Sequence, residues 1–342
     1  MNLNFLKIIH ASSEERRDLF LSTATRIGTT VQNIEKDFWV CWILDKLFND
    51  RSSDEPRLLF KGGTSLSKAY GLISRFSEDI DITVFREDLG QSIDIHQLGI
   101  LSGKKQRQQL ENIKQSCQTY LRDHLLKRLN TQMSLFDLEP ALLDPSDPDQ
   151  QTILIRYPSA IHSENSYIIP SIKIEAGAKS ALDPHQTISL SPYIAEEMPE
   201  DNFMVSNIIT INPERTFWDK VLILHGIRRW HDHRGKLRHE GNRISRHYYD
   251  IYRLVHSEVS QEAIRNKDLA LDCANHARLF FNTKDFDLSQ AKAGYFTLTP
   301  NLEMIEALKK DYLAMSTMIF GHIPDFEEII ETIKKLEAEL NS

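Results

Sequence analysis

Phe60-Lys-Gly-Gly-Thr-Ser-Leu-Ser-Lys68, followed closely by Arg75-Phe-Ser-Glu-Asp-Ile-Asp-Ile-Thr-Val84, is the part of the sequence that decides the fold. The first stretch predicts a short buried strand over 58–60 that passes through a glycine turn into a helix over 64–72. The second predicts a strand over 80–85 with alternating burial. Together they indicate an α/β unit in which a glycine turn and an acidic strand lie close together.

The glycine turn is suited to holding phosphate groups. Backbone amides without a neighbouring Cβ approach phosphate oxygens closely, and the N-terminal end of a helix adds partial positive charge. The predicted nucleotide contacts in this turn are Lys61, Gly62, Gly63, Thr64, Ser65 and Lys68. Strand-to-helix turns also use glycine for steric reasons alone, so the turn by itself leaves both interpretations open.

Asp79 and Asp81 supply the second half of the pattern. Residues two apart on a strand face the same side, so both carboxylates lie opposite Ile80 and Ile82. Two like charges this close repel each other, and Mg²⁺ removes that conflict because it binds one or two carboxylates together with substrate phosphates. The alternative is that Asp79 caps a turn and Asp81 is simply exposed. We interpret the pair as a metal and nucleotide site.

Transfer chemistry with two metal ions usually needs a third acid. The best candidate is Glu175, because Ile172 and Ile174 are expected to point inward and Lys173 and Glu175 outward. The predicted metal ligands are therefore Asp79, Asp81 and Glu175. An ordinary surface alternation of lysine and glutamate explains the Glu175 segment equally well.

Three further charged residues are candidates for supporting roles. Arg75 precedes the acidic strand and is expected to contact phosphate or to pair with Asp79. Lys220 lies partly in an apolar helical stripe, so it either extends its charge to solvent, the favoured interpretation, or meets a buried anion such as a triphosphate. Asp250 is expected to order an arginine or a water at the site, or to form a surface ion pair.

The rest of the chain predicts a bilobed α+β protein. Further strands are expected at 153–155, 168–174 and 205–211, and helices at 12–50, 99–130, 245–257, 260–281, 302–320 and 324–340. Asn212-Pro213-Glu214 is a typical helix start. We place the boundary there, between a mixed-sheet lobe over 1–211 and a mostly helical lobe over 212–342.

Composition narrows the functional classes. The 342 residues carry a net charge of −8, yet 104–128 and 228–247 are rich in lysine and arginine. These two basic segments suit a polyanion bound at one place, or they are simply solvated faces. The three cysteines form no CxxC pair, and no export signal or membrane span is recognisable. A cytoplasmic protein with no membrane contact is expected.

At several motifs the chain resembles the AbiEii/AbiGii toxin family of nucleotidyltransferases, within the DNA polymerase β superfamily. The resemblance is carried by the two stretches quoted first, and by Glu35-Lys-Asp-Phe-Trp-Val40, Glu214-Arg-Thr-Phe-Trp-Asp-Lys220, Arg246-His-Tyr-Tyr-Asp-Ile-Tyr252 and the segment 311–324. It implies catalysis by Asp79 and Asp81, with supporting roles for Lys220 and Asp250. Asp250 thereby competes with Glu175 for the role of third acid. It also implies a toxin of a toxin–antitoxin or abortive phage-infection system, acting beside a separately encoded antitoxin that is often a transcriptional regulator.

The leading hypothesis is a Mg²⁺-dependent transfer of NMP from an NTP to an RNA 3′ end, with tRNA as the favoured acceptor. One alternative keeps the enzyme but makes a protein hydroxyl the acceptor. A second alternative is a nucleotide-binding regulatory module without turnover.

Overall fold

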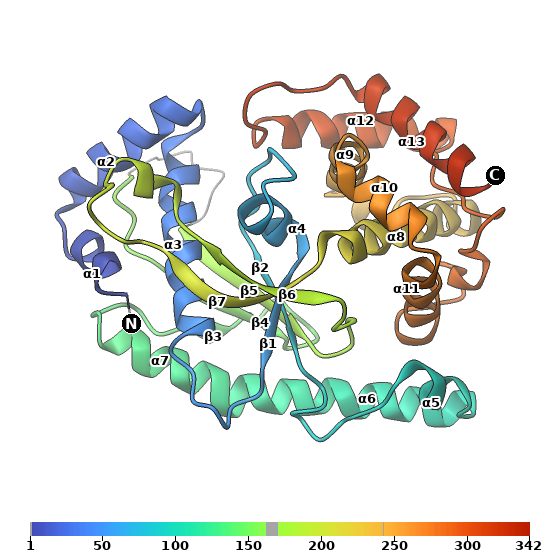
Figure 1. Ribbon diagram of the computed structural model, residues 1–342, viewed down its shortest axis with the longest axis horizontal. Helices are drawn as coiled ribbons and strands as arrows, with labels where there is room; N and C mark the ends of the chain where they lie inside the picture. Colours follow the sequence, from blue (N-terminus) through green and yellow to red (C-terminus); the bar gives the residue numbers. More distant parts are fainter. Residues whose placement is uncertain (1, 162–169, 242) are drawn as a thin grey trace. The chain divides into compact units, whose positions relative to one another are not determined.

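The computed structural model describes residues 2–161, 170–241 and 243–342, and the chain forms two compact units (Figure 1). The first unit comprises Met1–Tyr70, Phe76–Ile93 and Ser102–Ile211. The second comprises Gly71–Arg75, Asp94–Leu101 and Asn212–Ser342. Two short segments from the N-terminal half of the chain therefore belong to the mostly C-terminal unit.

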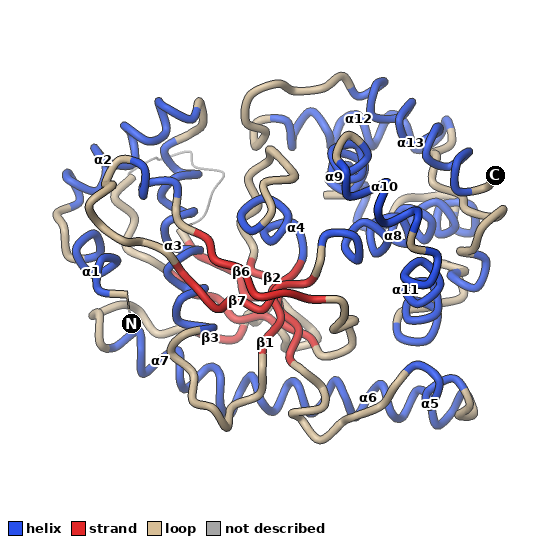
Figure 2. The backbone as a smooth tube through the Cα atoms, in the orientation of Figure 1, coloured by secondary structure: helices blue, strands red, loops and turns tan. Residues whose placement is uncertain are grey.

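The first unit is built on a seven-stranded mixed sheet with the strand order β3-β4-β5-β2-β1-β7-β6. Figure 2 draws its strands in red. Its strands are β1 Leu58–Lys61, β2 Ile80–Val84, β3 Leu142–Leu143, β4 Thr152–Arg156, β5 Ser171–Gly177, β6 His185–Leu190 and β7 Val205–Ile211. The predicted α+β class is confirmed. The strand predicted from residue 168 begins at Ser171, and positions 168–169 lie outside the described residues.

The two strands that carry the opening motifs lie in the middle of this sheet. β1 pairs with β2 antiparallel and with β7 parallel, while β2 pairs with β5 parallel. Neither β1 nor β2 is an edge strand, so their backbone groups are paired on both sides. The end of β1 and the start of β2 therefore lie inside the four adjacent strands β5-β2-β1-β7.

Helices surround the sheet within the same unit. They are α1 Leu3–Ile9, α2 Ser13–Ile27, α3 Val31–Phe48, α4 Gly62–Thr64, α6 Gly103–Tyr120 and α7 Leu126–Ser134, with π-helical turns at Ser65–Ala69 and Leu121–Leu125 and a 3₁₀ turn at Tyr193–Glu196. The helix α3 packs against β5 and β7. Every residue from Asn33 to Phe48 is buried, so α3 is enclosed on all sides, as a helix in the interior of a protein is.

The second unit is built from helices. These are α5 Ile95–Gly99, α8 Pro213–Arg234, α9 Ser245–Val255, α10 Glu258–Arg265, α11 Lys267–Phe280, α12 Leu302–Ser316 and α13 Phe326–Leu340, with 3₁₀ turns at Arg238–Gly241 and Leu288–Gln290. The helix predicted over 260–281 is in fact two helices, which was not foreseen. Asn266 ends the first, and its side chain accepts a hydrogen bond from the backbone N–H of Leu269 in the second.

The structure also describes the state of the three cysteines and the character of the helices. Cys41, Cys117 and Cys273 are free and buried, which agrees with the absence of a disulfide framework. Within the described ranges, no helix combines the length and the apolar character that a bilayer crossing requires.

Candidate active site

The glycine turn lies directly against one of the predicted catalytic carboxylates. Gly62 follows the last residue of β1 and has a φ of +82°, a conformation that favours glycine. A Cβ added to Gly62 would lie 2.0 Å from Oδ2 of Asp81 and 2.7 Å from its Cγ. Only glycine fits there, and its backbone and the Asp81 carboxylate therefore form one compact surface.

Asp79 and Asp81 flank a buried isoleucine at the start of β2. Asp81 lies on the strand and Asp79 directly before it, and both are partly exposed, whereas Ile80 and Ile82 are fully buried. The hydroxyl of Thr64 donates a hydrogen bond to the backbone carbonyl of Asp79. The turn thus anchors the acidic strand at the residue where the strand begins.

The sheet register aligns three charged residues in a row. Asp81 is the direct partner of Lys61 on β1 and of Glu175 on β5. Directly opposed residues in a sheet point to the same face, so the lysine and the two carboxylates share one side. Glu175 is exposed directly after the buried Ile174, as the predicted alternation requires. Lys173 forms an ion pair with Asp144, with Nζ 3.4 Å from Oδ2.

This donor set suits a cation that arrives with a triphosphate. Mg²⁺ commonly uses one or two carboxylates and completes its shell with water and substrate phosphates. In the part of the chain that the structure describes, no three His, Cys, Asp or Glu side chains cluster closely enough to hold an ion by themselves. The Gly62 backbone lies directly beside the Asp81 carboxylate, so a phosphate held by the turn and a cation held by the carboxylate would be neighbours.

The hydroxyls of the turn serve the backbone. Thr64 and Ser65 are both fully buried; Thr64 donates to Asp79, and the Ser65 hydroxyl donates to the carbonyl of Gly62 at 2.9 Å. Gly63 is the second residue of α4, and Lys61 is partly exposed at the end of β1. The backbone of the turn and Lys61, more than the two hydroxyls, are thus presented to a ligand.

Lys68 occupies a different position from the one expected of a phosphate-binding lysine. Its ammonium lies 2.8 Å from a carboxylate oxygen of Asp37 and 3.6 Å from the centre of the Tyr193 ring. Only 7% of the Lys68 side chain is exposed. Because its charge is engaged in this buried pair, Lys68 holds the helix after the turn against α3.

Arg75, Asp250 and Lys220 come together within the second unit. Arg75 forms a bidentate pair with the carboxylate of Asp250, Nε to Oδ1 at 2.7 Å and Nη2 to Oδ2 at 2.8 Å. Lys220 Nζ donates to the same Oδ2 at 2.7 Å. The snorkelling expected of Lys220 is wrong, since the side chain is buried and ends on an anion. For Arg75, expected to contact phosphate or to pair with Asp79, the structure gives an ion pair with Asp250.

The electrostatics of this cluster follow from two cations sharing one buried anion. Burial would raise the pKa of Asp250, but the charges of Arg75 and Lys220 outweigh burial and hold that pKa below its usual value. Burial, reinforced by Lys220 and Arg246, lowers the pKa of His247 well below its usual value. The cluster therefore carries an excess of positive charge around an ionised Asp250.

The two basic segments are less available than their sequences indicated. In the second unit Arg228 pairs with Asp232, Arg229 with Asp287 and Arg234 with Asp285, and Arg238 lies over the Trp230 and Phe286 rings. In the first unit Lys114 pairs with Asp149, and Arg128 with Glu55. Lys104, Lys105 and Arg107 are exposed in the first turns of α6. The net positive charge of each segment is thus partly compensated, by two acids from other parts of its own unit.

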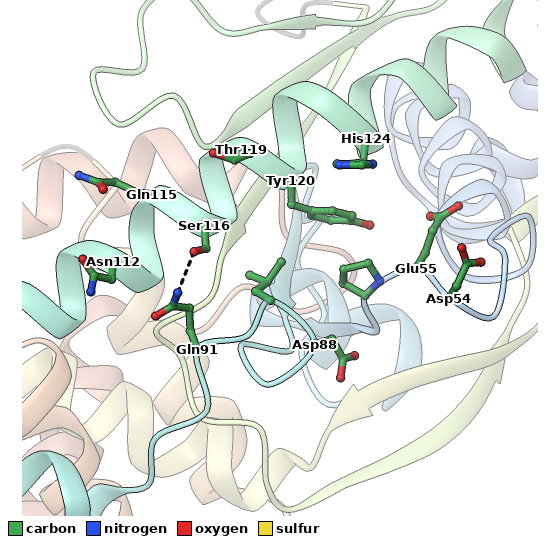
Figure 3. A pocket seen from close by; sticks show the side chains of 12 residues that line it. Asp54, Glu55, Asp88, Gln91, Asn112, Gln115, Ser116, Thr119, Tyr120 and His124 are labelled. Atoms are coloured by element: carbon green, nitrogen blue, oxygen red, sulfur yellow. Dashed lines mark hydrogen bonds between the residues drawn. The ribbon is translucent and has the colours of Figure 1, made fainter.

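A cavity of about 660 Å³ opens elsewhere in the first unit, and none of the predicted site residues lines it. One wall is a polar face of α6 that includes Asn112, Ser116 and Thr119, and Gln91 of the opposite wall hydrogen-bonds to Ser116 at 3.1 Å (Figure 3). The residues of the opposite wall come from the chain just before β1 and just after β2. The glycine turn, in contrast, comes just after β1, and Asp79 just before β2. The cavity is therefore at the other end of this strand pair.

The sequence analysis missed the charged residues of α3 that contact the segments next to the candidate site. Glu78 is partly buried and pairs with Lys36 of α3. Asp37, the partner of Lys68, was given no role. The available signal was the position of Glu35-Lys36-Asp37 directly before the apolar run from Phe38, because charges on an enclosed helix require partners.

A glycine turn held against a strand carboxylate on a central mixed sheet suits an enzyme that binds a phosphate-bearing substrate with its metal ion. The family model described as "Nucleotidyl transferase AbiEii toxin, Type IV TA system" matches residues 43–332. The chain belongs to this family of nucleotidyltransferase toxins, which implies an NTP as substrate and an antitoxin as partner.

Among solved structures, the nucleotidyltransferase toxin MenT4 of Mycobacterium tuberculosis H37Rv is similar to this chain. The match has 14% sequence identity and a TM-score of 0.47, and it covers 94% of this chain and 89% of that chain. Among curated proteins no match is found.

Proposed function

We propose that this toxin transfers NMP from an NTP to the 3′ hydroxyl of an RNA, with the acceptor end of tRNA as its target, in a Mg²⁺-dependent reaction. The observation that carries the proposal is the Gly62 backbone packed against the Asp81 carboxylate, with Lys61 and Glu175 in register on either side. This combination offers phosphate oxygens a backbone surface and offers their cation carboxylate ligands.

Asp79, Asp81 and Glu175 are the ligands assigned to Mg²⁺, which when bound neutralises charge on the triphosphate. The acceptor 3′ oxygen forms a new bond to the α-phosphorus, the bond to the β-phosphate oxygen breaks, and pyrophosphate leaves. Glu175, exposed beside Asp81, is assigned to accept the hydroxyl proton. The amides of Gly62 and Gly63 orient the phosphates.

Lys220 and Asp250 are assigned supporting catalytic roles in the helical lobe, residues 212–342. Arg75 joins them, because both cations are held by the one carboxylate of Asp250. A surplus of buried positive charge suits a polyanionic substrate. As a toxin of a cytoplasmic toxin–antitoxin pair, the enzyme would block translation in abortive infection by phage.

The direct test supplies purified protein with one labelled NTP at a time, total tRNA and Mg²⁺. We expect label on the RNA that is lost when EDTA is added, when the tRNA 3′ diol is first oxidised with periodate, or when Asp81 is replaced by asparagine. Asp149→Asn is the matched control, because Asp149 is an exposed aspartate of the same unit paired with Lys114. Absence of labelled RNA while the protein binds the NTP would count against the RNA acceptor.

One observation favours a second candidate, in which the acceptor is a protein hydroxyl. Several cations of the basic segments are paired with acids of their own unit, which weakens the argument for a polyanionic acceptor. Adding cell protein to the same reaction distinguishes the two, since label would then appear on a protein band. A binding module without turnover would instead keep its cellular effect in the Asp79→Ala and Asp81→Ala variants.

A further inference from the structure

Three consecutive charged residues are buried in the first turns of α3. Glu35, Lys36 and Asp37 have exposed fractions of 1%, 4% and 2%. Taking a charge out of water is unfavourable, and a buried ion pair is seldom better for stability than well-packed apolar side chains. Three such residues in a row therefore indicate a purpose other than stability, such as the fixing of one particular arrangement. All three precede residue 43, where the match to the family model begins.

Successive residues on a helix point about 100° apart, so three neighbours reach three different segments. Lys36 contacts Glu78, with Nζ 2.5 Å from Oε2. Glu78 is the residue directly before Asp79, and its backbone leads into the acidic strand. This ion pair consequently restrains the chain one residue away from a candidate metal ligand.

Asp37 restrains the other half of the candidate site. One of its oxygens pairs with Lys68 at 2.8 Å, and the other accepts a hydrogen bond from the backbone N–H of Tyr193 at 2.7 Å. Lys68 belongs to the π-helical turn Ser65–Ala69, which begins directly after Thr64. The Asp37 carboxylate, both of whose oxygens have partners, thereby connects the helix that follows the glycine turn to α3.

Glu35 completes the set on a third side. Its carboxylate accepts hydrogen bonds from the Ser159 hydroxyl and the Ala160 backbone N–H, both at 2.6 Å. These residues follow β4, the strand that pairs with β5 and so supports Glu175. Each of the three charges therefore acts on one segment: the acidic strand, the helix after the glycine turn, or the chain beyond β4.

We propose that Glu35, Lys36 and Asp37 are positioning residues that hold the acidic strand and the glycine turn in their reactive arrangement, an inference that rests on the proposed site. Lys36 is the most direct of the three, because its partner is adjacent to Asp79. Displacing reacting groups by about 1 Å can cost a reaction roughly 100-fold in rate. In the proposed function the turn at Gly62 holds the phosphates and the adjacent Asp81 holds their cation, so such a displacement would act on turnover.

The chain offers a matched control on the same helix. Lys46 is also a buried lysine of α3, 1% exposed, and it pairs with Asp50 at 2.8 Å and with Asp45 at 3.1 Å. Its partners lie on or just after the C-terminal end of α3, away from the turn and the acidic strand in the sequence. Lys36→Met and Lys46→Met each remove a buried lysine from one helix, and only the first removes a contact to the candidate site.

The experiment measures kcat and KM for the NTP, together with thermal stability, for wild type, Lys36→Met, Lys46→Met and the double variant Lys36→Met/Glu78→Gln. We expect kcat to fall about 10- to 100-fold in Lys36→Met and to stay at the wild-type value in the folded Lys46→Met protein, although both melt earlier. The double variant replaces the charge of Glu78, which has lost Lys36, by a neutral amide, so it should regain stability while its kcat stays low.

Two results would overturn the proposal: equal losses of kcat in Lys36→Met and Lys46→Met, or recovery of kcat together with stability in the double variant. Either would show that the lysine serves stability alone. If the wild type modifies neither RNA nor protein, the proposed function fails separately. The same variants are then compared by their affinity for a labelled NTP with Mg²⁺, where weaker binding in Lys36→Met alone supports positioning and equal binding refutes it.

Discussion

The row of Lys61, Asp81 and Glu175 and the cluster of Arg75, Asp250 and Lys220 contain similar residues in opposite states. In the first unit, two carboxylates share one face of the sheet and are partly or fully exposed. In the second unit, one carboxylate is fully buried and two cations hold it. The first group carries excess negative charge and suits an added cation, whereas the second carries excess positive charge around one buried carboxylate. Like residue types therefore serve different purposes according to burial and to the balance of neighbouring charges.

The largest effect on stability is expected from Asp250→Asn. The substitution leaves Arg75 and Lys220 buried without their shared anion, and breaking a buried ion pair from one side typically costs about 3–5 kcal/mol. Urea denaturation measures the free energy of unfolding. The double variant Asp250→Asn/Lys220→Met should recover part of the loss, because one unpaired charge is removed. If Asp250→Asn lowered the free energy of unfolding no more than Asp81→Asn does, the proposed difference between the buried and the exposed group of charges would be contradicted.

Asp81→Asn should show the opposite pattern, with a large effect on rate and a small one on stability. A carboxylate that neutralises the metal is needed in the reaction, so we expect a loss of about 10²- to 10³-fold in kcat. The side chain is partly exposed, and its loss should change the free energy of unfolding by less than about 1 kcal/mol. Initial rates and thermal melts measure both, with Asp149→Asn as control. A stability loss comparable with that of Asp250→Asn would refute the assignment.

Gly62→Ala tests the close approach of turn and carboxylate. The new Cβ would collide with Asp81 and would adopt a φ of +82°, so a loss of about 1–3 kcal/mol in stability is expected together with a lower rate. Gly90→Ala is the matched control, because Gly90 also has a positive φ, +70°, but open space where a Cβ would be. Both variants should lose stability to backbone strain. Unchanged activity in Gly62→Ala would show that the turn does not shape the site.

The smallest effect is a pH dependence from His247. Its pKa in the folded protein lies below the unfolded value of 6.5, so the unfolded state takes up a proton first as the pH falls. Stability from this residue is complete above pH 6.5 and declines below it, by at most about 1.4 kcal/mol per pH unit. Urea denaturation at pH 7.5 and 5.5 should show a smaller decline in His247→Gln than in wild type. Equal declines would argue that His247 is not held neutral.

Local patterns were sufficient for the central strands and many helices. The alternation from Asp79 to Ile82 predicted the burial of Ile80 and Ile82, and Asn212-Pro213-Glu214 predicted the start of α8. The alternation expected up to residue 85 is wrong beyond Ile82, because Thr83 is buried as well. The strand β6 was not predicted, because most of His185–Leu190 is exposed and shows no apolar alternation. A strand held mainly by backbone pairing to its neighbour leaves little trace in the order of its side chains.

Charged partners were the part that local patterns missed. Arg75 and Asp250 are separated by 175 positions in the chain, and Lys36 and Glu78 by 42. Spacing within one element shows whether a charge falls on a buried face, and it says nothing of which distant segment supplies the opposite charge. For Lys220 this led to the wrong expectation of a side chain reaching for solvent.

The sequence alone determined the acid pair, the glycine turn, the α+β class and the resemblance to a nucleotidyltransferase family, because each depends on residues close together in the chain. Only the tertiary structure decided that Asp81 lies between Lys61 and Glu175, that Gly62 admits no side chain, and that Asp250 holds two cations. These follow from strand register and helix packing, which join segments far apart in the sequence, and buried charges exist only where such packing brings them a partner.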